Sequence, residues 1–480
     1  MENQKISYID VAINKKTNYD ESIDAIVPDM YPDISKIIGV TANTYIKDSA
    51  VQNDRILISG DVLCDLCYVP EGEGAPIIMK VPLSFAHIEQ ALAEEIKVSC
   101  TIELNKVEAR VINPRKISIL ASICIHTKAY NEKIISMSDI VNDGYEILYH
   151  EESVNLIDSV NIDEFSISDN IEFKEIITND YELYGIKPRI IINDTKILKN
   201  KLMLRGDVEF VSTLLDEYDM MKISQSIPFS QILDINIRDE NLDANVEICI
   251  KSFDIENISG AEFSFNLNVK TCITQTKNEV FPVLSDIYDV KNELTINSSK
   301  YSVTNTPKCE LEKCDFNIFV DCENIVDSVL HSECQLFVEH DEKNMLECFA
   351  RVSGIYKSGR EYHNFEYKHK FMQELALSDV GFKNIKISNV GTNAINLNIT
   401  ADMYKYRDVK VDIDVVETIV RGNAHEKVSN TIILKYISNE TKLWEIAKKY
   451  NTTMMDIINS NSLEADIKVV SNVMLLIPVK

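Results

Sequence analysis

The chain has 480 residues, 45% of them hydrophobic and 26% charged, which is enough apolar material for several buried cores and suggests about three or four domains. Its 76 acidic residues outnumber 49 basic ones, and the resulting charge of −27 disfavours nucleic-acid or anionic-membrane binding as a main activity, because both need a basic surface. No apolar run approaches the roughly 18 residues of a membrane span, and Met1–Ile6 does not resemble a secretory signal. We therefore expect no transmembrane segment and no export. The 11 cysteines are then expected to be free thiols in a reducing compartment.

Short sequence matches repeat along the first 290 residues. Three pairs of tripeptides recur at offsets of 146 or 147 residues: Gly60–Val62 with Gly206–Val208, Pro82–Ser84 with Pro228–Ser230, and Ser138–Ile140 with Ser285–Ile287. A common offset of this length indicates tandem domains rather than a solenoid. We expect a third, divergent copy in which Cys348–Val352 takes the place of Gly-Asp-Val without its Gly and Asp.

The repeats have a hydrophobic period of two. Val62, Cys64, Leu66 and Tyr68 would face one side of a strand, and the residues between them the other. Many such strands separated by turn signals predict β-sandwich or barrel-like domains. We expect a short helix at His87–Glu95, and linkers near Asn297–Lys313 and Arg421–Glu426.

The last fifty residues predict a different unit, ordered strand, helix, helix, strand. Leu443, Ile446, Ala447 and Tyr450 have helical spacing, and Trp444, the only tryptophan, lies among them. Thr453 has an N-cap position with Asp456 three residues on.

Chemical signatures are weak. Cys64 and Cys67 would point to opposite faces of a strand, and the cysteines between Cys309 and Cys348, with His331 and His340 nearby, fit no zinc spacing. A basic, aromatic segment at Lys357–Phe371 could hold an anionic partner, but a hairpin with one solvated face is the simpler interpretation. We find no nucleophile elbow, metalloprotease motif or phosphate loop, so we predict no catalytic residue, metal or cofactor.

The final block resembles a LysM module. The resemblance lies in Leu443–Tyr450, then Ile457, Asn461 and Leu463, then Leu475–Pro478. The usual Gly-Asp-Thr-Leu-Trp entry is here Glu440–Trp444, and Asn472 replaces a turn glycine whose left-handed conformation it can adopt. LysM modules bind glycan or protein, and the altered entry favours a protein ligand. The resemblance implies a partner-binding surface at Glu440, Thr441, Lys442, Trp444, Asn461 and Asn472.

The repeats resemble SPOCS domains. The matching segments are Val27–Asp29, Pro32–Ile38, Gly60–Val62 with Tyr68 and Pro82, and Ala109–Ile117. SPOCS repeats followed by a LysM module are similar to spore-coat morphogenetic proteins of the SipL type. We therefore expect a mainly β fold with three SPOCS-like domains at residues 1–145, 146–296 and 297–425, and a βααβ LysM-like module at 426–480.

The resemblance also implies a function. Such a protein is not an enzyme. It acts in the mother-cell cytoplasm at the forespore surface, where its LysM module binds the basal coat ATPase scaffold and its repeats contact other coat proteins. One alternative is a peptidoglycan-binding protein or wall-hydrolase accessory that uses the same module on a peptidoglycan or chitin-like glycan. Another is an enzyme hidden in a repeat, which the carboxylate-rich composition allows without supporting.

Overall fold

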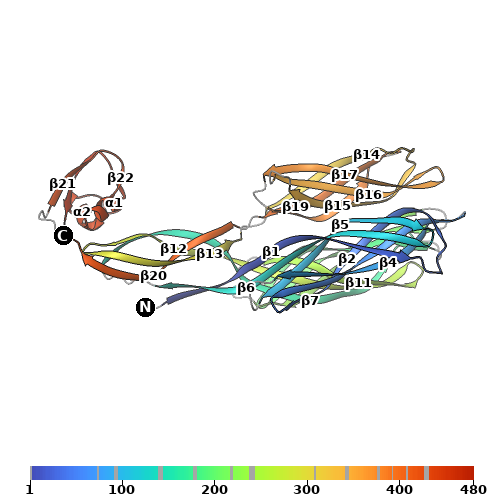
Figure 1. Ribbon diagram of the computed structural model, residues 1–480, viewed down its shortest axis with the longest axis horizontal. Helices are drawn as coiled ribbons and strands as arrows, with labels where there is room; N and C mark the ends of the chain where they lie inside the picture. The colour runs from blue at the N-terminus through green and yellow to red at the C-terminus, as the bar shows by residue number, and fades with distance from the viewer. Residues whose placement is uncertain are drawn as a thin grey trace.

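A computed structural model describes residues 3–72, 75–90, 96–138, 144–176, 181–216, 220–236, 244–306, 310–340, 345–375, 379–391, 393–406, 409–425 and 432–479. These residues are mostly β-strand, and the two short helices described both lie near the C-terminus (Figure 1). The predicted mainly β architecture with a small βααβ module is confirmed.

The first copy is a sandwich of two antiparallel sheets. One has the order β2-β3-β4, and the other contains β1, β6 and β5. Strands alternate between core and surface as the period of two predicts, so that Ile56, Ile58, Val62 and Leu66 of β3 are all buried between the sheets. The bounds are β1 Asn3–Ile26, β2 Ile34–Gln52, β3 Arg55–Pro70, β4 Ile77–Gln90, β5 Lys97–Asn113 and β6 Lys116–Ser138.

The second copy has the same topology. Its sheet β8-β9-β10 faces strands β7, β12 and β11. Strand β7 pairs with β1 of the first copy, so the sheets that contain these two strands join into one six-stranded sheet. The bounds are β7 Tyr145–Glu172, β8 Tyr181–Leu198, β9 Lys201–Asp216, β10 Met220–Asp234, β11 Ala244–Ser259 and β12 Glu262–Asp289.

A third sandwich follows. Sheet β15-β16-β17 packs on β14-β19-β18, and β13 pairs with β20 as an extension of β14 and β19. The bounds are β13 Asn292–Asn305, β14 Glu310–Val320, β15 Ser328–His340, β16 Met345–Ser358, β17 Glu361–Leu375, β18 Asp379–Asn389, β19 Ile395–Tyr406 and β20 Val409–Ala424.

A glycine facing a cross-strand phenylalanine occurs in every copy. A Cβ atom at Gly60 would lie 2.5 Å from the Phe85 ring, and one at Gly206 3.0 Å from Phe229. The third copy has this pair at Gly354 and Phe365, whose ring would lie 2.6 Å from such a Cβ. The assignment of this place to Cys348–Val352 was therefore wrong, because the glycine lies further along β16.

Three other local predictions were also wrong. Segments expected to be linkers, Asn297–Lys313 and Arg421–Glu426, fall largely within β13, β14 and β20. Polar side chains of β13 bond β20 at an accessible surface, since Asn297 donates to Thr418 at 3.0 Å and Ser299 donates to Glu417. The helix expected at His87–Glu95 is strand β4 as far as Gln90, and residues 91–95 lie outside the described ranges.

Strand ends from all three copies share one narrow core. Tyr8, Leu156, Phe281, Val303 and Ile413 are at most 3% exposed and pack together, although they come from β1, β7, β12, β13 and β20. We call the extension formed by β13, β20, residues 145–157 of β7 and residues 276–289 of β12 the stalk. It runs from the sandwiches toward the C-terminal module (Figure 1).

The three sandwiches also meet at a buried junction. The apolar part joins side chains from the three-stranded sheets of all copies: Ile38, Cys67, Ile78, Tyr184, Leu215, Met220, Leu330 and Ile355. Gly185 permits the close approach, because its φ is +65° and a Cβ atom would lie 2.7 Å from Thr41.

The carboxylate of Glu333 lies at this junction and is bound by all three copies. Thr41 of the first copy donates to it, Lys187 of the second lies 2.7 Å away, and His331 of its own copy lies 3.0 Å away. Burial alone would raise the pKa of Glu333, but Lys187 and His331 hold that pKa far below its usual range.

Arg115 closes the loop between β1 and β2. Its guanidinium donates to the carbonyls of Tyr31 (2.6 Å) and Val27 (2.9 Å) and to the carboxylates of Asp33 and Asp29. The residues that resemble a SPOCS domain in Val27–Asp33 and around Arg115 are thus one structural unit.

We predict that Glu333→Gln lowers the thermal unfolding midpoint at pH 7 and also flattens its dependence on acid. Since the folded pKa is the lower one, the ionised carboxylate stabilises the fold fully above the usual glutamate pKa of about 4.3, and this stabilisation is lost as the pH falls below it. Midpoints measured from pH 3 to 7 test this, with Glu339→Gln on the same strand as control. Equal acid slopes in the wild type and Glu333→Gln would contradict it.

We predict that Arg115→Met weakens the first copy locally by about 2 kcal/mol, because the buried Val27 carbonyl and its neighbours lose a charged donor. The backbone amides of Val27 and Ile34 donate to the backbone carbonyls of Arg115 and Pro114, and their hydrogen-exchange rates should rise in the variant. The control Arg110→Met removes a side chain that is 80% exposed and should leave these rates unchanged. Unchanged exchange in Arg115→Met would refute the role of the clamp.

Candidate docking site

The C-terminal module has the predicted βααβ order. Two hairpin-like pairs, β21–β24 and β22–β23, enclose the two helices. Thr453 caps α2 by accepting from the Asp456 amide at 2.9 Å, as predicted. The bounds are β21 Ile432–Ile437, β22 Thr441–Lys442, α1 Leu443–Lys449, α2 Met454–Asn461, β23 Val469–Val470 and β24 Val473–Pro478.

Trp444 joins the module to the stalk. It is 7% exposed, its Nε1 donates to Asp286 of β12 at 2.8 Å, and its ring meets Tyr288 edge-on at 5.0 Å. Tyr288 and Val290 belong to the same apolar cluster as the core of the module. Trp444 is therefore occupied by an intramolecular contact in this structure.

Two further polar contacts support this joint. Lys448 donates to Asp286 at 2.6 Å, and the Tyr288 hydroxyl donates to the Thr452 carbonyl at 2.8 Å. Burial alone would raise the pKa of Asp286, but the bonds from Lys448 and Trp444 lower it below its usual value. The module is thus fixed to the stalk by one apolar contact surrounded by hydrogen bonds.

The two asparagines of the predicted surface have structural roles. The Asn461 side chain bonds the Ile457 carbonyl and both backbone groups of Leu476, each at 2.7 Å, and so ties α2 to β24. Asn472 has a φ of +50°, which confirms the left-handed conformation expected at that turn.

The entry segment lies on the surface. Glu440 and Lys442 are exposed, Thr441 is half-buried, and Lys442 stands at the N-terminus of α1. These three side chains are accessible, whereas Trp444 and Asn461 are committed within the molecule.

Sequence reasoning missed an exposed apolar face on the β21–β24 pair. Leu434 and Tyr436 of β21 are 62% and 56% exposed, and they lie opposite Leu476 and Met474 of β24. We use the name outer apolar face for five exposed side chains: Ile432, Leu434, Tyr436, Met474 and Leu476. The signal was available, because both alternating faces of β21 and β24 are largely apolar although only one can face the helices. Contiguous exposed apolar side chains of this kind mark interaction surfaces.

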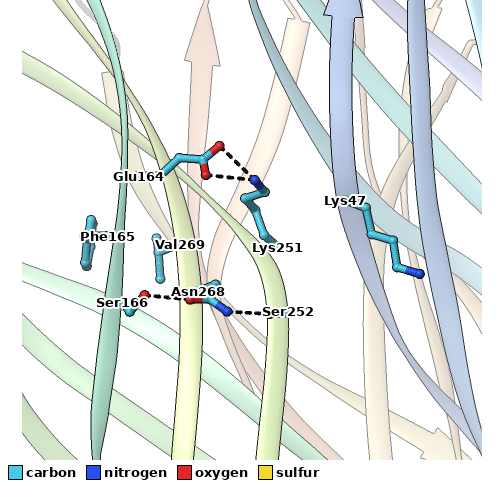
Figure 2. A pocket seen from close by; sticks show the side chains of 8 residues that line it. All are labelled: Lys47, Glu164, Phe165, Ser166, Lys251, Ser252, Asn268 and Val269. Carbon is cyan, nitrogen blue, oxygen red and sulfur yellow. Dashed lines mark hydrogen bonds and ion pairs between the residues drawn. The ribbon is translucent and has the colours of Figure 1, made fainter.

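A polar pocket between the first two copies satisfies its own groups (Figure 2). Glu164 accepts twice from Lys251, and Ser166, Asn268 and Ser252 form a hydrogen-bonded chain. Lys47 on the opposite strand pairs with Asp61. The polar side chains that line this pocket are therefore already paired within the protein.

The basic, aromatic segment is the β16–β17 hairpin. Lys368 bonds both carboxylate oxygens of Glu339 at 2.9 Å and lies over the Phe349 ring, and Lys370 pairs with Glu347. Acidic neighbours therefore offset these basic groups, which agrees with a solvated hairpin face.

The ten cysteines that the structure describes form no disulfide, and Cys309 lies outside the described ranges. Cys64 packs in the first core and Cys67 in the junction, so they face opposite sides of β3 as expected. Burial raises the pKa of Cys64 to about 12, which keeps it a thiol. Within the described ranges, no three His, Cys, Asp or Glu side chains gather as a metal site requires.

Comparison with known proteins supports the resemblance. Residues 33–119 match the family model described as SipL, SPOCS domain. The matched segment runs from just before β2 into β6 and includes Arg115 and Asp33, whereas the other clamp residues, Val27, Asp29 and Tyr31, precede it. The match indicates a sporulation-associated protein similar to SipL. No curated protein and no solved structure matches the chain. Neither described helix is long and apolar enough to cross a membrane.

We predict that Asp286→Ala releases the module from the stalk, because Trp444 and Lys448 lose their shared acceptor. The emission of Trp444, the only tryptophan, should then shift to longer wavelength as its ring becomes solvated. Asp412→Ala, an exposed carboxylate on β20, is the control and should leave the emission unchanged. An unshifted spectrum in Asp286→Ala would show that the joint does not depend on this carboxylate.

Proposed function

We propose that this chain is a non-enzymatic spore-coat assembly protein that tethers coat to the forespore surface. The C-terminal module binds the basal coat ATPase scaffold, and the sandwiches contact other coat proteins. It acts in the mother-cell cytoplasm. The observation that carries the proposal is the outer apolar face, supported by the SPOCS match in the first copy.

The outer apolar face has the properties of a protein contact. It combines one aromatic and several aliphatic side chains, and all of them except Leu476 are more than half exposed. Aromatic and aliphatic anchors of this kind contribute most of the affinity of protein interfaces. The cationic Lys435 between them lies over the Tyr450 ring, on the inner side.

The position of the module fits a tether. The module lies at one end of an elongated molecule and the sandwiches lie toward the other, with the stalk between them (Figure 1). Strand β21, which carries three of the five residues of the outer apolar face, lies on the side of the module away from the stalk (Figure 1). A scaffold bound there would leave the sandwich surfaces free, and several modest contacts would add through effective concentration.

We predict that Leu434→Glu in the full chain weakens binding to the purified coat ATPase scaffold by about tenfold or more, since it places a charge in an apolar contact. The matched control Met455→Glu changes a side chain that is 54% exposed on helix α2 of the same module, and it should bind normally. Affinity can be measured by surface-immobilised binding, with unchanged Trp444 emission showing that both variants remain folded and docked.

Two outcomes would overturn the proposal. Equal binding by Leu434→Glu and the wild type would remove the outer apolar face from the interface. Sedimentation of the full chain with peptidoglycan, without affinity for the scaffold, would favour the wall-binding alternative, and Lys442→Glu would then test whether the entry segment contacts the glycan.

A further inference from the structure

A second candidate site lies between the second and third sandwiches, far along the chain from the module. Strands β8, β9 and β10 form one wall of a 370 Å³ cavity, and β15, β18 and β19 form the other. This volume falls within the range of small-molecule sites, about 300–1,000 Å³. The cavity opens to solvent, because Lys222 and Lys386 on its lining are both exposed.

The cavity lining is positively charged in a strongly acidic chain. Four cationic side chains, Lys187, Arg189, Lys222 and Lys386, face two carboxylates, Glu209 and Glu333. Lys187 is committed to Glu333. Apart from this pair, the lining carries three cationic side chains and one carboxylate, Glu209. The lining is thus net positive, although the chain as a whole carries a charge of −27.

The three remaining cations are poorly compensated. Arg189 donates to the Ile385 carbonyl, and Lys222 to the Ile387 carbonyl at 3.1 Å, so both bond neutral oxygens of β18. Lys386 lies 3.9 Å from Glu209, at the limit of an ion pair. Partial burial lowers the pKa of Lys222 most, the nearby Arg189 lowers it further, and Glu209 opposes both effects.

The neutral groups of the lining suit an oxyanion. Ser224, Ser388 and Thr400 bring hydroxyl donors to the same cavity. Arginine and lysine beside hydroxyl groups are the usual partners of phosphate oxygens, the arginine through its planar fork and the lysine as a point charge.

We propose that this cavity binds a phosphate-bearing small molecule, with Arg189, Lys222 and Lys386 as its cationic ligands. The bound anion would relieve the repulsion between Arg189 and Lys222. It would also bridge the second and third sandwiches, since two ligands come from β8 and β10 and one from β18. Binding would therefore stiffen this joint without involving the outer apolar face.

The test uses the full chain with pyrophosphate and inorganic phosphate as probes, against sodium chloride at equal ionic strength. We expect pyrophosphate to raise the unfolding midpoint in a saturable manner, and phosphate to do so more weakly, because ligand binding to the folded state stabilises it. A response that chloride reproduces at equal ionic strength would overturn the proposal.

Three variants locate the site. Lys222→Met and Arg189→Gln should weaken pyrophosphate binding by about tenfold or more in calorimetric titration. Because both side chains also hold β18, Lys386→Met is the decisive variant: its side chain is 58% exposed and donates to no backbone carbonyl among the described residues. Lys196→Met, exposed elsewhere on β8, makes the same charge change and should bind normally. Equal affinity in Lys386→Met and Lys196→Met would refute the assigned ligands.

Discussion

The buried carboxylate of Glu333 is the constraint around which the three sandwiches are arranged. A charge removed from water needs several donors, and here they come from Thr41, Lys187 and His331, one from each copy. No single copy could bury this group, because each supplies only part of its hydrogen bonding. The surrounding apolar junction packs side chains of all three copies together, and the Tyr184 ring meets His331 with their centroids 4.9 Å apart. The repeats therefore form one body with a shared centre rather than separate domains on flexible connections.

The stalk follows from the same arrangement. The three-stranded sheets of the copies meet at the junction, and the long strands β7, β12, β13 and β20 extend from the sandwiches in a common direction. The apolar faces of these strands meet around Phe281 and Val303. At its far end Arg421 of β20 bonds Asp289 of β12 and lies over the Tyr145 ring of β7, so three of the stalk strands are tied together. Asp286 and Tyr288 are thereby held as a firm platform for Trp444. A module placed on this platform keeps a defined orientation, which a tether with a flexible linker would not provide.

Much of the sandwich architecture was legible in the sequence, because a period of two is a local property. The alternation at Val62–Val69 predicted which side chains of β3 share a face, and it separated Cys64 from Cys67 correctly. The residues around Val27–Asp33 and Arg115 indicated a SPOCS domain, and the clamp explains their chemistry. Predictions failed where polar, aromatic-poor segments pair in exposed sheets, as in β13, since composition alone makes such strands look like linkers. Gly354 was missed because it lacks the Asp-Val that follows Gly60 and Gly206, although it lies 148 residues beyond Gly206 (354 − 206), close to the 146 between the first two.

The candidate site shows a different limit. Trp444 was predicted to be a binding residue from its place in the LysM-like entry segment, with packing on the first helix as the alternative, but its partner Asp286 is 158 residues away in sequence. Such a contact leaves no local trace. The outer apolar face can be recognised in the sequence. A two-stranded sheet needs only one apolar face to cover its helices, so the apolar side chains of Leu434 and Tyr436 on the other face are not needed for this packing. Exposed apolar area has a cost in solubility, and in a chain of charge −27 that cost is tolerated most readily where a partner covers the surface. In this module Trp444 fixes the domain to the stalk, and strands β21 and β24 carry the apolar surface that a partner can contact.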